Sequence, residues 1–478
     1  MQFSAASIFF MVTLWQPELL WIDGRFHADA GLLVDEQGRI LQVRFADSPA
    51  LGEAEIQRIP LPGKAMLPGM VNVHSHAFQR LIRGKTESRQ SGGNNFWSWR
   101  GAMYRAAATL APQQMFRVAR MAFLEMALAG ITCVGEFHYV HRSPEGRPYS
   151  DPNELALQII AAANSVGIRI ALLRAAYQRA GYGLPADSGQ IRFLESTEEF
   201  LANLSDLQAR HHSTEAWVGV APHSVRAVPL PALQRIAAWA NERRLPVHMH
   251  VSEQVAEVEA CRREYGATPV RLLARHGILG PDFTAIHAIH VDEEEMALLA
   301  ASGATVGCCP TTERNLGDGI FAAREAMELE IPIAFGSDSQ AQIDPLEDAR
   351  EVEYHLRLRL QQRSLLDGIA GQRIAARLFH CATVNGAAAL HCDGGKLEPG
   401  RPADFFTVDR KDVSIAGLDA DDLLPGIVFG INRGAIADVV VGGRFVIRDH
   451  RHPGQEEIIH QYEEVARRVW SAPQLAAN

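Results

Sequence analysis

The stretch Leu67-Pro68-Gly69-Met70-Val71-Asn72-Val73-His74-Ser75-His76 decides how the rest of the chain is interpreted. It has the composition of a buried strand that ends in two histidines, one residue apart. Side chains alternate between the two faces of a strand, so His74 and His76 point the same way. Two imidazoles that converge there can share one metal ion, and zinc and its first-row neighbours suit such nitrogen ligands. For this triplet alone, a turn histidine pair without a metal is an equally good interpretation.

Composition and charge limit the class of protein. The chain has 478 residues, enough for one large domain or two ordinary ones. It is 47% hydrophobic and 21% charged, which is typical of a soluble globular enzyme. The formal net charge of −10 argues against a general nucleic-acid-binding protein, because such proteins carry basic patches. The six cysteines contain no Cys-x-x-Cys pair and are too few for a disulfide framework, so a reducing cytoplasm fits best.

The two ends of the chain have similar strand-rich compositions. Residues 1–15 are mildly apolar and too short to span a bilayer, and we expect residues 1–10 to be an extension without a role in the fold. Short strand-like runs separated by Asp/Gly turns follow in residues 12–62, which is typical of a small antiparallel sheet. Similar runs return at residues 403–408 and 437–447. We expect one small β-sandwich domain built from both ends.

The middle of the chain alternates short apolar runs with amphipathic helical patterns. The expected strands cover residues 67–76, 131–137, 168–173, 216–221, 246–251, 283–287, 305–309 and 331–336. Continuous apolar strands with helical crossovers indicate a parallel sheet that is covered on both faces. Eight such units predict a (β/α)8 TIM-type barrel, whose active site lies at the C-terminal ends of the strands.

These patterns predict a particular order of domains along the chain. The predicted order is an extension (1–10), a first β-domain part (11–66), the barrel (67–392), a second β-domain part (393–450), and a C-terminal helix and tail (451–478). The barrel is thus expected to be inserted between the two parts of the β-domain.

Four of the expected strand ends carry histidine or aspartate. The residues concerned are His74 and His76 on the first strand, His248, His250 and Glu253 on the fifth, His287 and His290 on the sixth, and Asp338 on the eighth. A lone histidine at a strand end is more often a satisfied polar residue than a metal ligand. Four separate strand ends with such residues are hard to explain by chance. Together they indicate a metal site.

The pattern resembles the amidohydrolase superfamily, whose (β/α)8 barrels carry His-x-His on the first strand, histidines on the fifth and sixth, and aspartate on the eighth. The resemblance implies that the metal ligands are His74, His76, His250 and Asp338, with His287 beside the metal. His248 shares a face with His250 and competes for the same role. We choose His250 because its spacing to Glu253 is the one that the deaminase branch uses. His290 is expected to be a supporting or structural residue.

Lysines provide evidence about the number of metal ions. Binuclear hydrolases of this superfamily usually bridge two metals with a carbamylated lysine from the middle of the barrel. The chain's lysines, none of which lies on the expected strands two to seven, are Lys64, Lys85, Lys396 and Lys411. We therefore expect one divalent ion, most simply Zn²⁺, with iron or manganese as alternatives. The lysines do not decide the alternative of two metals bridged by a carboxylate.

The expected chemistry is hydrolytic. A divalent ion lowers the pKa of bound water, so hydroxide becomes available near neutral pH to attack an sp² carbon that bears nitrogen. Asp338 can accept the proton of the water, and Glu253 can pass a proton to the leaving nitrogen. His287 can orient the hydroxide. The zinc nucleobase deaminases divide the work in the same way, with a glutamate that is not a ligand. Alternatively, Glu253 is only a helix-start carboxylate at the favourable end of a helix dipole.

Further stretches narrow the substrate class. They are residues 74–80, 96–100, 135–139, 221–226 and 309–319. Together they are similar to the formimidoylglutamate deiminases, a family within the same superfamily. The resemblance implies hydrolysis of N-formimino-L-glutamate to N-formyl-L-glutamate and ammonia in histidine degradation. It also makes a homodimer the expected assembly.

A small-molecule dicarboxylate substrate requires cationic partners. Arg100 and Arg226 are candidates for bidentate contacts to its carboxylates. Gln79, Tyr139 and His223 can add hydrogen bonds near the reacting group or the carboxylates. Each has a plainer alternative, because most arginines are solvated and a tyrosine at a strand end often only packs.

Two other functions remain open at this point. One is a related deaminase that acts on a purine, pterin or adenosine-like ring, which would need stacking aromatic residues more than paired arginines. The other is a catalytically inactive barrel that serves as a binding protein. The intact set of expected ligands and Glu253 argue against the second alternative.

Overall fold

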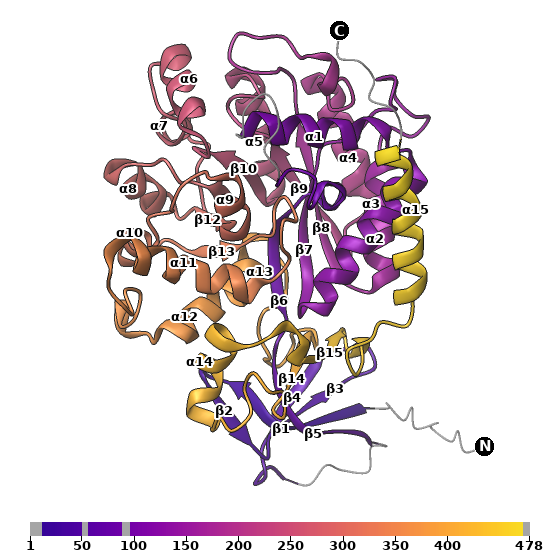
Figure 1. Ribbon diagram of the computed structural model, residues 1–478, viewed down its shortest axis with the longest axis vertical. Helices are drawn as coiled ribbons and strands as arrows, with labels where there is room; N and C mark the ends of the chain where they lie inside the picture. The colour runs from indigo at the N-terminus through magenta and orange to yellow at the C-terminus, as the bar shows by residue number, and fades with distance from the viewer. Residues whose placement is uncertain (1–11, 50–55, 88–95, 472–478) are drawn as a thin grey trace, which may run out of the picture.

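A computed structural model describes residues 12–49, 56–87 and 96–471. The expectation for residues 1–10 therefore lies outside the described residues. The molecule consists of a barrel surrounded by helices, with a separate sheet packed below the barrel (Figure 1). Within the described part of the chain, no helix combines the length and the apolarity needed to cross a membrane.

Eight parallel strands form the barrel, and they follow one another in sequence order around it. They are β6 (Met70–Ser75), β7 (Ile131–His138), β8 (Arg169–Ala176), β9 (Ala216–Pro222), β10 (Val247–Val251), β11 (Phe283–His287), β12 (Thr305–Cys308) and β13 (Ile333–Phe335). Almost every residue of these strands is buried, as expected for a parallel sheet covered by helices. The predicted (β/α)8 barrel is confirmed.

The barrel closes between its first strand and the residues that follow its last strand. The Asp338 N–H donates to the His74 carbonyl and the His76 N–H donates to the Asp338 carbonyl, both at 3.0 Å. Just before these residues in each segment, Asn72 and Ser337 are paired. The Ser337 N–H donates to Asn72 Oδ1 at 3.0 Å, and Asn72 Nδ2 donates to Ser337 Oγ at 2.7 Å. The two histidines that open the barrel and the aspartate that ends it are therefore joined through their backbones.

Helices cover the outside of the barrel and follow most of its strands. They are α1 (Phe96–Thr109), α2 (Pro112–Leu128), α3 (Glu154–Val166), α4 (Thr197–Arg210), α5 (Leu230–Arg243), α6 (Val255–Tyr265), α7 (Pro269–Arg275), α8 (Glu293–Ser302), α9 (Pro310–Leu316), α10 (Ala323–Glu328), α11 (Pro345–Leu360), α12 (Ile374–His380) and α13 (Gly386–Ala389). Local sequence explains several of their ends. Ser196 accepts a bond from the Glu199 N–H at the start of α4, a reciprocal capping box. Gly167 ends α3 with a φ of 97°, which favours glycine.

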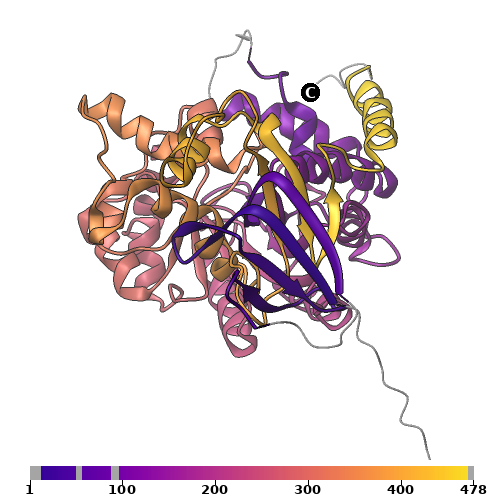
Figure 2. The same ribbon diagram turned by 90° about the horizontal axis from the view of Figure 1, so that it is seen from below.

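The second sheet combines strands from the N-terminal and C-terminal parts of the chain, as the sequence predicted. It is built from β1 (Val12–Ile22), β2 (Arg25–Ala28), β3 (Gly31–Val34), β4 (Ile40–Arg44), β5 (Ile56–Pro68), β14 (Phe405–Asp409), β15 (Ile436–Val441) and β16 (Arg444–Ile447). Strands from the two ends lie side by side, with β14 antiparallel to β5 (Figure 2). The expected antiparallel pattern is wrong at one pairing, because β5 returns parallel to β1 after the β3–β4 hairpin.

Two further helices accompany the C-terminal strands. Helix α14 (Ala420–Gly430) lies between β14 and β15, and α15 (Gln455–Ser471) follows β16. Helix α15 lies along α2 on the outside of the barrel (Figure 1). It also supports η1 (Ala77–Ile82), the single-turn segment that follows the two histidines. The Trp470 indole N–H donates to the Leu81 carbonyl at 3.0 Å, and the Tyr462 hydroxyl donates to the Arg80 carbonyl at 3.1 Å.

Candidate active site

Four metal-ligating side chains meet at the C-terminal end of the barrel. One ligand atom from each lies within 4.8 Å of those of the other three, and all four side chains are buried. These residues, here called the four-donor group, are His74, His76, His250 and Asp338. Asp338 Oδ1 lies 3.4 Å from His74 Nε2 and 3.3 Å from His76 Nε2. Three imidazoles and one carboxylate are a donor set that suits zinc.

Backbone carbonyls orient two of these histidines. The Nδ1–H of His76 donates to the Phe137 carbonyl at 2.8 Å, and that of His250 donates to the His223 carbonyl at 2.9 Å. Both Nε2 atoms are left unprotonated and able to bind a cation. His74 is fully buried, and neither of its ring nitrogens has a hydrogen-bond partner among the described residues. Because burying polar atoms without partners is costly, this arrangement fits a metal ligand.

The charge states of the group also fit a cation. Burial lowers the pKa of His74 to about 3 and holds the pKa of His250 well below its usual value, so both imidazoles are neutral. Burial acts to raise the pKa of the Asp338 carboxyl, but the adjacent His74 and His76 imidazoles outweigh this effect and hold the pKa well below the usual range. A neutral imidazole and an ionised carboxylate are the forms that bind metals.

His287 lies beside the four-donor group and is held from behind by a glutamate. Its Nδ1 lies 3.1 Å from Glu313 Oε1, and its Nε2 lies 3.8 Å from Asp338 Oδ2. Glu313 is buried and also accepts the Cys309 N–H at 2.8 Å, which fixes the carboxylate. Burial acts to lower the pKa of His287, but the charges of Glu253, Glu313 and Asp338 raise it to about 10.

Glu253 faces His287 from the loop that follows β10. Its Oε1 lies 3.9 Å from His287 Nε2, and burial raises the pKa of its carboxyl. Helix α6 begins two residues later, at Val255, so Glu253 precedes the helix instead of opening it. Its backbone N–H donates to Glu257 Oε2 at 3.1 Å, so the first turn of α6 holds the loop in place.

The other two candidate histidines lie apart from the four-donor group. His248 shares strand β10 with His250, but its Nε2–H donates to the Ala389 carbonyl at 2.9 Å, on the short helix α13. His290 donates from Nε2 to the Asp318 carbonyl at 2.9 Å. Each imidazole therefore has a backbone partner of its own. The choice of His250 over His248 agrees with this geometry.

The two candidate arginines meet at a tyrosine. Arg100, on α1, lies with its Nη2 at 3.3 Å from the Tyr177 hydroxyl, and Arg226, after β9, lies with its Nη1 at 3.4 Å from the same oxygen. Arg226 also donates to the Ala180 carbonyl at 3.2 Å. Burial acts to raise the pKa of Tyr177, but the charges of both arginines lower it below its usual value. This arrangement brings two cations together beside the histidines.

The remaining candidate residues line the inner end of the pocket. Gln79 donates from Nε2 to the Tyr139 hydroxyl at 2.9 Å, and its buried Oε1 has no hydrogen-bond partner among the described residues. Tyr139 is buried, with its hydroxyl 3.4 Å from Met103 Sδ. The His223 ring stacks on His250 with the centroids 4.7 Å apart. All three residues line the same small space as His76, His250 and Asp338.

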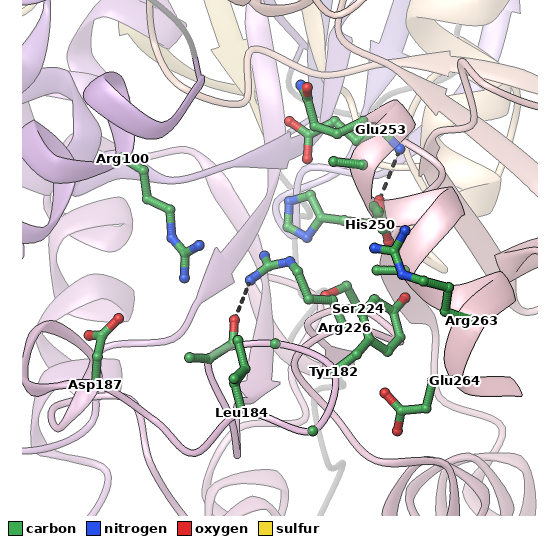
Figure 3. A pocket seen from close by; sticks show the side chains of 17 residues that line it. Arg100, Tyr182, Leu184, Asp187, Ser224, Arg226, His250, Glu253, Arg263 and Glu264 are labelled. Carbon is green, nitrogen blue, oxygen red and sulfur yellow. Dashed lines mark hydrogen bonds between the residues drawn. The ribbon is translucent and has the colours of Figure 1, made fainter. Parts of the chain in front are cut away.

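Two connected spaces lead to these residues. The inner one holds only about 40 Å³ and is lined by His76, His287 and Asp338 among others. The outer one holds about 750 Å³ and is lined by the segment 180–184 and one side of α6. Both spaces share four lining residues: Arg100, Arg226, His250 and Glu253. Figure 3 shows Arg100 and Arg226 reaching into the outer cavity, with His250 and Glu253 toward its inner end.

Sequence reasoning missed two residues that organise the site. Glu313 lies in the quoted stretch 309–319, yet nothing in the sequence indicated that it reaches back to His287. Tyr177 follows β8 directly, and the expected strand, which ended at 173, was too short to place it at a strand end. A longer strand prediction could have singled out Tyr177.

Comparison with known proteins defines the family. The sequence pattern described as the amidohydrolase family matches residues 65–446. The chain belongs to the amidohydrolase family. This amidohydrolase is 39% identical over 404 residues to a formimidoylglutamate deiminase from Pseudomonas aeruginosa, an alignment that covers 84% of this chain and 89% of the relative. It is 26% identical to a 5-methylthioadenosine/S-adenosylhomocysteine deaminase from Pyrococcus furiosus, over 80% and 84% of the two chains.

A solved structure supports the same family. The crystal structure of an amidohydrolase from Brucella melitensis matches with a TM-score of 0.86 and 32% sequence identity. The match covers 96% of this chain and 99% of that one. The resemblance to the amidohydrolase superfamily and to the formimidoylglutamate deiminases within it is confirmed.

Proposed function

We propose that this amidohydrolase converts N-formimino-L-glutamate and water to N-formyl-L-glutamate and ammonia, as a step of histidine degradation. Its 39% identity to a formimidoylglutamate deiminase supports this choice within the family. The observation that carries the proposal is the pair Arg100 and Arg226, which meet at Tyr177 where the two spaces join. In a protein of net charge −10, one buried and one partly buried arginine that meet beside a metal-ligating group suit an anionic substrate.

The proposed cofactor is one divalent ion, most simply Zn²⁺, held by His74, His76, His250 and Asp338. The unpartnered ring of His74 and the three-imidazole, one-carboxylate donor set support this assignment. When bound, such an ion supplies Lewis acidity that makes a water molecule acidic enough to react near neutral pH. The absence of a lysine from barrel strands β7 to β12 supports one ion instead of a lysine-bridged pair.

Two carboxylates of the chain carry out proton transfer. Asp338 is ionised and accepts the proton of the attacking water. Glu253, whose pKa is raised by burial, donates a proton to the leaving nitrogen, which departs as ammonia. His287, held at Nδ1 by Glu313, presents Nε2 to the oxygen of the tetrahedral centre. Its positive charge then stabilises the negative charge that develops on that oxygen.

The residues around the inner space bind and orient the substrate. Arg100 and Arg226 bind the two carboxylates, because guanidinium groups match carboxylates in a bidentate geometry. Gln79, Tyr139 and His223 supply hydrogen bonds near the formimino group. The unpartnered Oε1 of Gln79 is an acceptor that suits an N–H of the substrate.

The deciding experiment measures ammonia release from formiminoglutamate beside guanine and an adenosine derivative, with the metal-loaded protein. We expect turnover of formiminoglutamate only. Preferred turnover of a ring compound would assign the protein to the alternative deaminases, to which it is also related. Elemental analysis of the same sample tests the other alternative, since a binding protein without metal would contain no stoichiometric divalent ion.

We further propose that the enzyme is a homodimer of the cytoplasm. All six cysteines are buried and free, which supports a reducing compartment. Light scattering of the purified protein at several concentrations tests the dimer. Fractionation of cells that express it tests the compartment.

A further inference from the structure

A second group of metal-ligating side chains lies behind Asp338. One ligand atom each from His287, Cys309 and Asp338 lies within 4.8 Å of the other two, and all three residues are buried. The three follow or end successive strands of the barrel, β11, β12 and β13. Only Asp338 belongs to both this group and the four-donor group.

The carboxylate of Asp338 turns one oxygen toward each group. Oδ1 lies 3.4 Å from His74 Nε2 and 3.3 Å from His76 Nε2, whereas Oδ2 lies 3.8 Å from His287 Nε2. A carboxylate in this position can bind one ion through each oxygen. Two-metal enzymes hold ions about 3.5–4 Å apart, so the sharing of one carboxylate is sterically reasonable.

His287 offers an open nitrogen to this second group. Its Nδ1 is occupied by Glu313, and its Nε2 is buried without a hydrogen-bond partner among the described residues. Only 1% of this side chain is exposed, so water does not readily replace the missing partner. This open nitrogen is evidence for a ligand that does not depend on the cysteine.

The thiol of Cys309 is also weakly held. Its Sγ lies 3.9 Å from the Gly307 carbonyl, which is long for a hydrogen bond. The sulfur packs close to Gly336, where an added Cβ would come within 3.1 Å of it. Glycine at this position therefore leaves room for the thiol next to the residues that lead into Asp338.

We propose that His287, Cys309 and Asp338 form a second cation site, which takes a soft divalent ion such as zinc or cadmium and inhibits the enzyme. Thiolate and imidazole ligands select soft and borderline ions over magnesium or calcium. On binding, the ion displaces the Cys309 thiol proton and the His287 Nε2 proton to solvent. It forms one bond to the thiolate sulfur and one to the imidazole nitrogen, without any change of oxidation state. Inhibition rests on the proposed function, because the ion occupies His287 Nε2 and the second oxygen of Asp338.

The test compares C309S with C308S in protein loaded with one equivalent of zinc. Both thiols are buried at the end of β12, but Cys308 does not belong to the second group, so C308S is a matched control. Cadmium is added, and its binding is measured by equilibrium dialysis and by thiolate-to-cadmium charge-transfer absorption. We expect the wild type and C308S to bind a second ion with this absorption. C309S should bind it at least roughly tenfold more weakly and without the absorption.

Activity provides a second measurement. Excess cadmium should inhibit the wild type and C308S in step with the absorption, while C309S should resist inhibition relative to its own rate without cadmium. Equal second-ion binding by C309S, or a wild type that shows no thiolate absorption, would overturn the proposal. The wild-type absorption needs neither substrate nor a folded variant. A protein that shows it but does not act on formiminoglutamate would overturn only the proposed function.

Discussion

The inner and outer parts of the pocket share four residues but are built differently. Around the inner space of about 40 Å³, metal-ligating side chains come from strand ends and are held by backbone carbonyls or buried carboxylates. The outer space of about 750 Å³ is lined mainly by the segment 180–184 and by α6, outside the barrel strands. The barrel thus fixes the reacting groups, and loops shape the entry for the substrate. We expect substitutions of the inner metal-ligating and proton-transfer residues to change metal content and kcat, and substitutions of the arginines where the two parts meet to change KM.

The largest effect should come from the histidine pair on β10. His250→Asn should lose the metal and all measurable turnover, because it removes one of four donors. His248→Asn, two residues away on the same strand, should retain both, because His248 only donates to the Ala389 carbonyl. Elemental analysis and the ammonia assay on both variants give the answer. Metal loss from the His248 variant alone would contradict the assignment.

The next largest effect should come from Glu253→Gln. It removes the proposed proton carrier, so kcat should fall by roughly 10²–10⁴-fold with the metal content unchanged. Glu259→Gln, on an exposed part of α6, is the control and should behave as the wild type. Near-normal turnover in the Glu253 variant would assign the proton transfer to another group.

Arg226→Ala tests the arginines where the two parts meet. Charge-assisted hydrogen bonds are worth about 1.5–3 kcal/mol, so KM for formiminoglutamate should rise roughly 10–100-fold with the metal retained. Arg263→Ala is the matched control, because Arg263 lines the outer space but not the inner one. Arg226→Lys should recover only part of the loss, since an ammonium group lacks the bidentate fork. A fall in kcat without a change in KM would erase the distinction between the two parts.

The smallest effect concerns the stability of the metal-free protein. The folded-state pKa of His287 is raised to about 10, above its ordinary value, so its stabilising contribution is fully present below about pH 6.5. It is lost progressively as the pH rises from about 6.5 through 10. Glu313→Gln should flatten this loss, whereas Glu293→Gln on the surface of α8 should not. Urea unfolding of the chelated protein at several pH values measures this loss. An equally steep fall of the free energy of unfolding with pH in the Glu313 variant would exclude the His287–Glu313 ion pair as its cause.

The sequence predicted the parts of the molecule that depend on regular periodicity. Strands and crossover helices led to the barrel, and the barrel placed His74, His76, His250 and Asp338 at one end. The sequence could not predict hydrogen-bond partners that come from distant parts of the chain. The Phe137 carbonyl that orients His76 is 61 residues away, and no side-chain type marks a carbonyl for this role.

Contacts made by loops were equally difficult to predict. Arg100 and Arg226 meet at Tyr177 only because α1 and the segment after β9 approach each other across the end of the barrel. The direction in which β5 returns to the second sheet was also missed, because strand composition does not distinguish parallel from antiparallel neighbours.

Helix α15 has a consequence for how the pocket is completed during synthesis of the chain. The indole of Trp470 supports the Leu81 carbonyl across 389 residues of sequence, and the turn so supported carries Gln79 into the inner space. A nascent chain that has finished all eight barrel strands still lacks this support. The barrel can therefore assemble on the ribosome before the Gln79 turn is fixed, and the substrate pocket reaches its final form only after α15 has emerged.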